Sequence, residues 1–282
     1  MGARRNRRLL PAASPYPMRP PARAQGGYNA RMAKYFDINE QGCSIRCKLF
    51  CADPHAVKRV VVCCHGFGGG KDSAAIATFA ERAVAKRKGT AVIAFDWLCH
   101  GADARKNLLL EECDEYLSIV IEYARNRFET DELYAYGTSF GGYLLLKYLS
   151  EHGNPFHKVA LRCPAINMLA TLLDNAASDD DRASLAAGKP VLMGFDRKVK
   201  VGPQFVQAVE AADIRQRPFF DFADDIIILH GTADETVPCE DSVRFADDNV
   251  IEFVPIEGAD HRFHDPKKMD AAIARIIAFF GW

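Results

Sequence analysis

Short apolar runs alternate with amphipathic stretches along most of the chain. Thr90 to Phe95 is a nearly continuous apolar run with the length of one buried strand. Leu110 to Phe128 repeats apolar residues three and four positions apart, which predicts an amphipathic helix. Tyr35 to Asp53 predicts two strands that turn at Gln41 and Gly42. Further strands are predicted at Val57 to Cys64, Glu132 to Tyr136, Lys158 to Cys163, Asp225 to Leu229 and Val250 to Val254, and further helices at Asp72 to Lys88, Phe140 to Glu151 and Met269 to Phe280.

Apolar strands separated by helices are typical of a parallel sheet covered on both faces, so the sequence predicts an α/β fold. Ile166 to Phe222 interrupts the alternation. This segment has a helical opening, an acidic run, a middle rich in Gly and Pro, and a second helix around Gln204 to Ala212. An insertion of this length between two core strands is usually functional, because loops at strand ends hold ligands.

Residues 1–31 differ from the rest in composition. They contain seven arginines and five of the 14 prolines but no acidic residue, so we expect a disordered basic tail. The only apolar stretch after the basic start is Leu9 and Leu10, because Pro11 follows, and two residues are too few for a secretory signal. We expect Met32 to be the natural start, the preceding residues to be a dispensable tail or a translation artefact, and 32–282 to be one domain.

Composition excludes several classes of protein. No apolar run approaches the 18 residues of a membrane span, and the chain after the tail has no long basic stripe for nucleic acid. The nine cysteines are an odd number, and most are expected to be reduced in a cytoplasmic protein. Cys43, Cys47 and Cys51 lack a partner C-x-x-C or histidine pair, so no metal site is predicted.

Gly137 to Gly141 reads GTSFG and fits G-x-S-x-G between an apolar strand and a helix. In this context the motif predicts a sharp turn that raises the Ser139 hydroxyl above the sheet as a nucleophile. The flanking glycines are needed because a Cβ at either position would clash.

A serine nucleophile needs a base and an acid that orients it. Asp234 follows one predicted strand and His261 follows the next, which gives the chain order Ser, Asp, His. Less favoured candidates are His264 for the base and Glu235 or Asp241 for the acid. His230 is expected to shape the turn of the acid, and Asp260 to act as a turn or cap residue.

HGFGGG at His65 to Gly70 follows an early strand. Glycines let a backbone approach a developing oxyanion closely, so we assign the stabilising N–H groups to Phe67 and Phe140. A phosphate-binding loop is not favoured, because Asp72 stands after Lys71 where that motif requires Ser or Thr.

These motifs, together with the segment after Asp96, mean that residues 35–282 resemble the α/β-hydrolase superfamily, in particular serine esterases of the cinnamoyl/feruloyl and prolyl-oligopeptidase-like groups. The resemblance implies an α/β-hydrolase fold, the triad Ser139, Asp234 and His261, and an inserted cap between core strands six and seven at about 166–222. The family usually has Gly-x-Gly-x-Ser after the position of Asp96, whereas this chain has LCHGAD at Leu98 to Asp103.

The sequence thus predicts a serine carboxylesterase without cofactor or metal, acting on a small ester with a short-acyl or hydroxycinnamoyl group. Thioesterase, acyltransferase and peptidase activities use the same triad, and a non-catalytic binding protein of this fold is a further alternative. The whole chain has a net charge of −1, with 36 basic and 37 acidic residues. Without the seven arginines of the tail, 29 basic residues remain and the charge is −8, which favours neutral or apolar esters.

Overall fold

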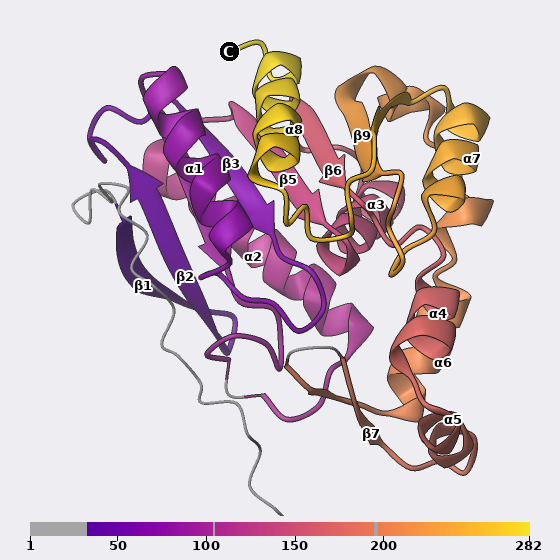
Figure 1. Ribbon diagram of the computed structural model, residues 1–282. Helices are drawn as coiled ribbons and strands as arrows, with labels where there is room; N and C mark the ends of the chain where they lie inside the picture. The colour runs from indigo at the N-terminus through magenta and orange to yellow at the C-terminus, as the bar shows by residue number, and fades with distance from the viewer. Residues whose placement is uncertain (1–32, 104, 195–196) are drawn as a thin grey trace, which may run out of the picture. The chain divides into compact units, whose positions relative to one another are not determined.

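An eight-stranded sheet forms the centre of the computed structural model, which describes residues 33–103, 105–194 and 197–282 (Figure 1). Its strands are β1 (Ala33–Glu40), β2 (Cys43–Cys51), β3 (Arg59–Cys64), β4 (Thr90–Phe95), β5 (Leu133–Thr138), β6 (Lys158–Arg162), β9 (Ile226–Gly231) and β10 (Glu252–Ile256). They lie in the order β1-β2-β4-β3-β5-β6-β9-β10. β2 pairs antiparallel with β1 and β4, and all other neighbours are parallel. The predicted, mostly parallel sheet is confirmed, whereas the expected basic tail lies outside the described residues.

Helices cover both faces of this sheet. They are α1 (Ala74–Lys86), α2 (Leu110–Phe128), α3 (Phe140–His152), α7 (Cys239–Asn249) and α8 (Pro266–Phe279). α1 and α8 lie on one face, and α2 and α3 lie on the other (Figure 1). Successive strand residues point to opposite faces, so Val60 and Val62 of β3 join one apolar cluster while Val61 and Cys63 join the other. No helix among the described residues is long and apolar enough to cross a membrane.

The segment between β6 and β9, the sixth and seventh strands of the large sheet, contains the insertion that the sequence predicts. Its elements are α4 (Met168–Ala170), a π-helical turn (Thr171–Ala176), α5 (Asp179–Ala186), the hairpin strands β7 (Val191–Met193) and β8 (Val199–Val201), α6 (Pro203–Ala211) and two 3₁₀ turns (Ile214–Gln216 and Phe220–Asp225). The acidic run begins α5, where Ser178 and Asp181 form a capping box. The helical opening and second helix are present, and the role of the segment as a cap stays a prediction.

Several observed elements were not expected from the sequence, among them the hairpin β7-β8 and the helix α7. The strands of the hairpin β7-β8 have three residues each, which is too short for an alternation to be recognised. In α7 the buried face contains Ser242 and Asn249 beside Phe245 and Ala246. Asn249 bonds the backbone of Phe245 and of Phe219, so its burial is stabilised by hydrogen bonds that a hydrophobic pattern does not reveal.

A buried carboxylate ties together the loops that follow β3 and β4. Asp96 accepts hydrogen bonds from Lys71 N (2.7 Å), Lys71 Nζ (2.8 Å) and Ala102 N (2.7 Å). Gly101, with φ of +51°, lies so near that a Cβ would come within 2.0 Å of this carboxylate. The ion pair therefore fixes the glycine-rich loop at residues 65–71.

We expect Asp96→Ala to lower the free energy of unfolding by about 3 kcal/mol or more, because it removes three buried hydrogen bonds and leaves the Lys71 cation only a longer contact with Asp72 (3.5 Å). Asp37→Ala is the control, since it breaks an exposed pair with Arg46 and should cost less than about 1 kcal/mol. Urea denaturation followed by circular dichroism measures both losses. Equal losses in the two variants would contradict a structural role for the buried pair.

Candidate active site

Ser139 occupies the turn between β5 and α3. Its φ of 52° and ψ of −119° lie in a region that residues with a side chain rarely adopt. The Ser139 N–H donates to the carbonyl of Arg162 on β6 (3.0 Å), and the Ser139 carbonyl accepts from Gly142 N (2.9 Å). Hydrogen bonds on both sides hold this conformation, and the side chain lines a cavity of about 660 Å³.

The glycines beside Ser139 leave room for the neighbouring elements. A Cβ on Gly141 would lie 2.3 Å from the carbonyl oxygen of Cys64 in β3, and one on Gly137 would lie 2.6 Å from a methyl group of Leu145. The clash of Gly141 is with backbone, so this position requires glycine. At Gly137 the methyl group can move, but backbone atoms of Gly141 and Gly142 at 3.0 Å still favour glycine. This steric requirement is the one that the GTSFG motif predicts.

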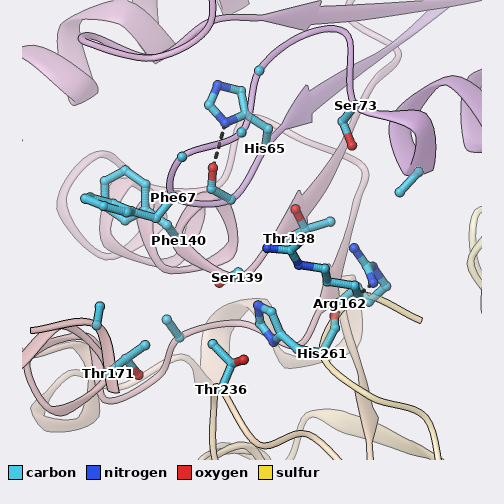
Figure 2. Close-up of a pocket in the computed structure, with 18 of the residues that line it drawn as sticks. His65, Phe67, Ser73, Thr138, Ser139, Phe140, Arg162, Thr171, Thr236 and His261 are labelled. Atoms are coloured by element: carbon cyan, nitrogen blue, oxygen red, sulfur yellow. Dashed lines mark hydrogen bonds between the residues drawn. The ribbon is translucent and has the colours of Figure 1, made fainter. Parts of the chain in front are cut away.

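His261 and Asp234 meet next to the same cavity. Nδ1 of His261 lies 2.7 Å from Oδ2 of Asp234. The Asp234 side chain is fully buried, whereas that of His261 keeps 18% of its surface exposed and lines the cavity with Ser139 (Figure 2). This pairing uses Nδ1 and leaves Nε2 of His261 available on the cavity side.

The Asp234 carboxylate is held ionised by several donors. Its Oδ1 accepts from Thr236 N and Val237 N (both 2.8 Å), and its Oδ2 also contacts Nε2 of His230 (3.1 Å). Burial alone would raise its pKa, but the hydrogen bonds from His230 and His261 outweigh this and hold the pKa of Asp234 well below its usual range. His230 thus contacts the carboxylate of the predicted acid and, through the Val237 carbonyl (3.1 Å), the turn that carries it.

The less favoured candidates lie away from this arrangement. His264 pairs with Asp260, which also accepts from His264 N, and the His264 side chain is 73% exposed. Glu235 is exposed, and Asp241 lies in the first turn of α7. Neither rival acid contacts His261 in the part of the chain that the structure describes.

Phe67 and Phe140 both line the cavity, and their rings meet edge to face with centroids 5.6 Å apart. Phe140 is the first residue of α3, where a backbone N–H has no partner within the helix. The loop that carries Phe67 is fixed by His65, whose Nδ1 lies 2.8 Å from the Gly66 carbonyl and whose Nε2 accepts from Trp97 N (3.1 Å). The predicted pair of N–H groups therefore stands on two rigid elements.

His100 packs behind this pair and was not singled out from the sequence. Its ring lies 5.3 Å from that of Phe67 and 6.1 Å from that of Phe140, measured between centroids. Nδ1 lies 2.6 Å from the carbonyl of Leu98, whereas the buried Nε2 has no hydrogen-bond partner among the described residues. His100 lies in LCHGAD, the segment that departs from the Gly-x-Gly-x-Ser pattern of the family that the sequence resembles, and this departure was the available signal.

Arg162 is a second residue that the sequence did not reveal. It ends β6, is 7% exposed and lines the cavity. Its guanidinium donates to the hydroxyl of Tyr136 (3.2 Å) and to the backbone carbonyl of His261 (3.2 Å), and it lies 5.0 Å from the centre of the Phe263 ring. A polar residue at the end of a strand was visible in the sequence, but its burial was not.

Cysteine sulfur is also close to the acid and base. Ligand atoms of Cys163, Asp234 and His261 all lie within 4.8 Å of one another. Because His261 and Asp234 already bond each other, this grouping is explained without a metal ion. Cys43, Cys47 and Cys51 pack in the apolar core on β2.

The strain at Ser139 has a measurable consequence. Ser139→Gly should be more stable than Ser139→Ala by about 1 kcal/mol or more, because glycine adopts positive φ without the steric cost borne by alanine. Both variants lack the hydroxyl, so their difference reports the relief of backbone strain, reduced by the greater unfolded-state entropy of glycine. Urea denaturation measures the two free energies of unfolding, and an alanine variant as stable as the glycine variant would argue against strain.

Buried neutral histidines predict a loss of stability in acid. Burial lowers the pKa of His65 to about 3 and that of His100 to about 4. Histidine in the unfolded chain titrates near pH 6.5, so below that pH the unfolded state binds more protons. The contribution of these two neutral histidines to the free energy of unfolding is complete above about pH 6.5 and is lost progressively toward pH 4.

His100→Phe keeps a ring in place and cannot be protonated. As the pH falls from 6 to 4.5, the free energy of unfolding should therefore decrease less steeply in this variant than in the wild type, by up to about 1.4 kcal/mol per pH unit. Urea denaturation at several pH values measures this slope. His55→Asn, at an exposed position, is the control and should keep the wild-type slope. An unchanged slope in His100→Phe would contradict the assignment.

A family model described as the alpha/beta hydrolase fold matches residues 59–205. No curated protein sequence gives a significant match. Among solved structures, Est1E from Butyrivibrio proteoclasticus with bound ferulic acid is similar, with a TM-score of 0.71, 19% identity, and coverage of 88% of this chain and 100% of that one. The esterase domain of a Rhodothermus marinus protein gives a TM-score of 0.62, 18% identity, and coverage of 88% and 97%.

Monoacylglycerol lipase from Paleococcus ferrophilus is a third similar structure, with a TM-score of 0.60, 19% identity, and coverage of 84% of this chain and 98% of that one. At these identities the structural likeness concerns the fold. The family model, in contrast, matches more than half of the chain and includes β3, β5 and the Ser139 turn. The chain therefore belongs to the α/β-hydrolase fold family.

Proposed function

We propose that this protein is a serine hydrolase that cleaves carboxylic esters through an acyl-enzyme intermediate. The observation that carries the proposal is the contact between His261 Nδ1 and Asp234, beside the cavity that Ser139 and His261 line together. A histidine bound in this way presents Nε2 as the base for a serine hydroxyl. The esterase and lipase among the similar structures support the same class of reaction.

The first half of the reaction forms the acyl-enzyme. His261 Nε2 takes the hydroxyl proton as Ser139 Oγ attacks the ester carbonyl, and Asp234 stabilises the imidazolium that results. The Phe67 and Phe140 N–H groups bind the oxygen on which negative charge develops. When the tetrahedral intermediate collapses, the bond to the alcohol oxygen breaks and His261 returns the proton to that oxygen.

The second half releases the acid. A water molecule gives a proton to His261 and attacks the acyl carbon, and Ser139 regains its proton as the ester bond to the enzyme breaks. No step requires a metal or an organic cofactor. Short-acyl and hydroxycinnamoyl esters are the proposed substrates, and Met168 and Leu172 of the inserted segment supply apolar cavity wall for such groups.

Variants of the proposed triad test this mechanism. With 4-nitrophenyl butyrate, Ser139→Ala should lower kcat by about 10⁶ and Asp234→Asn by about 10⁴. Thr78→Ala is the control, because it removes a hydroxyl on α1 that does not line the cavity. Stopped assays measure the rates, and circular dichroism checks that each variant is folded. Retained activity in Ser139→Ala would refute the proposal.

A fluorophosphonate probe separates the remaining alternatives. Wild-type protein should be labelled on Ser139, whereas a non-catalytic binding protein of this fold would not react. Thioesters, acyl acceptors and peptide amides offered to the same protein then distinguish thioesterase, acyltransferase and peptidase from esterase activity. Labelling without turnover of any ester would favour one of these alternative reactions.

A further inference from the structure

The cavity beside Ser139 carries basic side chains and no acidic ones. None of the described residues that line it is an Asp or Glu. Its basic lining residues include Arg162, Arg262 and His261. Thr138, Thr171 and Thr236 add neutral hydroxyl groups to the wall. This local charge is opposite to the net charge of −8 that the sequence has beyond its first 31 residues.

Arg162 is a buried cation without a carboxylate partner. Within the described ranges its hydrogen bonds go to the Tyr136 hydroxyl and the His261 carbonyl, and no acidic group lies within ion-pair distance of it. The nearby carboxylate of Asp234 is already bonded by His230 and His261. Asp234 attracts the guanidinium only from beyond ion-pair distance. Burying a guanidinium with no carboxylate in direct contact is costly, so its presence in a cavity wall points to a ligand that supplies the contact.

The N-terminus of α1 adds to the same field. Ser73, Ala74 and Ala75 line the cavity, and the first turn of this 13-residue helix contains no acidic residue. Amides at a helix N-terminus lack partners within the helix and carry partial positive charge. Asp72 precedes the helix but bonds Tyr35 and Lys48, and it does not line the cavity.

From this arrangement we propose that the protein acts on esters that carry a second, anionic group, and that Arg162 binds this group. The proposal rests on the proposed esterase function and narrows its substrate class. In the view of Figure 2, Arg162 and Ser73 lie on one side of Ser139 and Thr171 lies on the other. The side with Arg162 holds the anion, and the side with Thr171 accepts the apolar part of the ester. The inserted segment that carries Thr171 also contributes Met168, Leu172 and Ala176 to the cavity wall.

Paired substrates of similar size test the charge preference. The first pair, 4-nitrophenyl hydrogen succinate and 4-nitrophenyl pentanoate, tests an anion in the acyl group. The second pair, 3-carboxy-4-nitrophenyl butyrate and 4-nitrophenyl butyrate, tests an anion in the alcohol. A charge-assisted hydrogen bond predicts a kcat/KM about tenfold or more higher for the anionic member of one pair. Preference for the neutral member in both pairs would overturn the proposal.

Arg162→Gln tests the residue itself. The preference for the anionic substrate should fall from about tenfold or more to less than about twofold, whereas Arg82→Gln should preserve it, because Arg82 pairs with Asp270 outside the cavity. If Arg162 only positions His261 through its carbonyl, both substrates will lose the same factor in kcat/KM. An equal loss would therefore overturn the proposal.

A second variant covers the case in which Arg162→Gln does not fold. Ala74→Asp places a carboxylate in the first turn of α1, where it suits the helix dipole and repels an anionic substrate. We expect the ratio of kcat/KM for anionic over neutral ester to fall about tenfold. An unchanged ratio would argue against an anion at this end of the cavity.

Binding separates failure of this inference from failure of the esterase proposal. Amides are poor esterase substrates, so calorimetry with Ser139→Ala can compare N-(4-nitrophenyl)succinamic acid with N-(4-nitrophenyl)pentanamide. Tighter binding of the acid, lost in Ser139→Ala combined with Arg162→Gln, would support the anion site even if no ester were cleaved. Equal affinity for the two amides would reject the anion site, even where ester cleavage confirmed the hydrolase.

Discussion

The backbone conformation of Ser139 is the constraint on which the site depends. Positive φ at this residue turns the chain from β5 into α3 within one position, and the turn is stable because Gly137 and Gly141 let three elements approach each other closely. A hydrogen bond from Ser139 N to the Arg162 carbonyl of β6, and those that the Ser139 carbonyl accepts, then oppose the strain. The hydroxyl of Ser139, the proposed nucleophile, thus stands between a strand and a helix of the core, whereas the proposed acid and base come from loops at the ends of β9 and β10.

The buried charges of this protein are balanced by nearby groups, and the net charge of the chain does not describe their surroundings. Asp96 and Lys71 are paired away from water, and Asp234 is surrounded by donors. These three buried charges therefore have oppositely charged or hydrogen-bonding partners close by. Arg162 departs from this pattern, because its neighbours are a phenol, a carbonyl and an aromatic ring. The net charge of −8 therefore does not predict which ligand the cavity prefers.

The features that could be predicted are those that leave a pattern in the sequence, either because a backbone turn requires glycine or because a buried element requires regularly spaced apolar residues. The GTSFG turn needs glycine for steric reasons, and the wholly buried strands leave continuous apolar runs, so the fold and the neighbourhood of Asp234 and His261 could be found. It did not reveal α7, whose buried face is partly polar, nor His100 and Arg162. The roles of these residues depend on burial and on partners distant in the chain, such as Phe67 or Tyr136, and no local pattern records such contacts.

Arg162 also links the cavity to the acid and base. Its guanidinium bonds the carbonyl of His261, the residue that in the proposed mechanism becomes positively charged by taking the proton from Ser139. Two like charges in a partly buried site oppose each other, because the low dielectric strengthens their repulsion. An anion bound to Arg162 would cancel this repulsion as the proton moves. A substrate anion would then contribute to the rate of the chemical step as well as to binding, and its effect should appear in kcat as well as in KM.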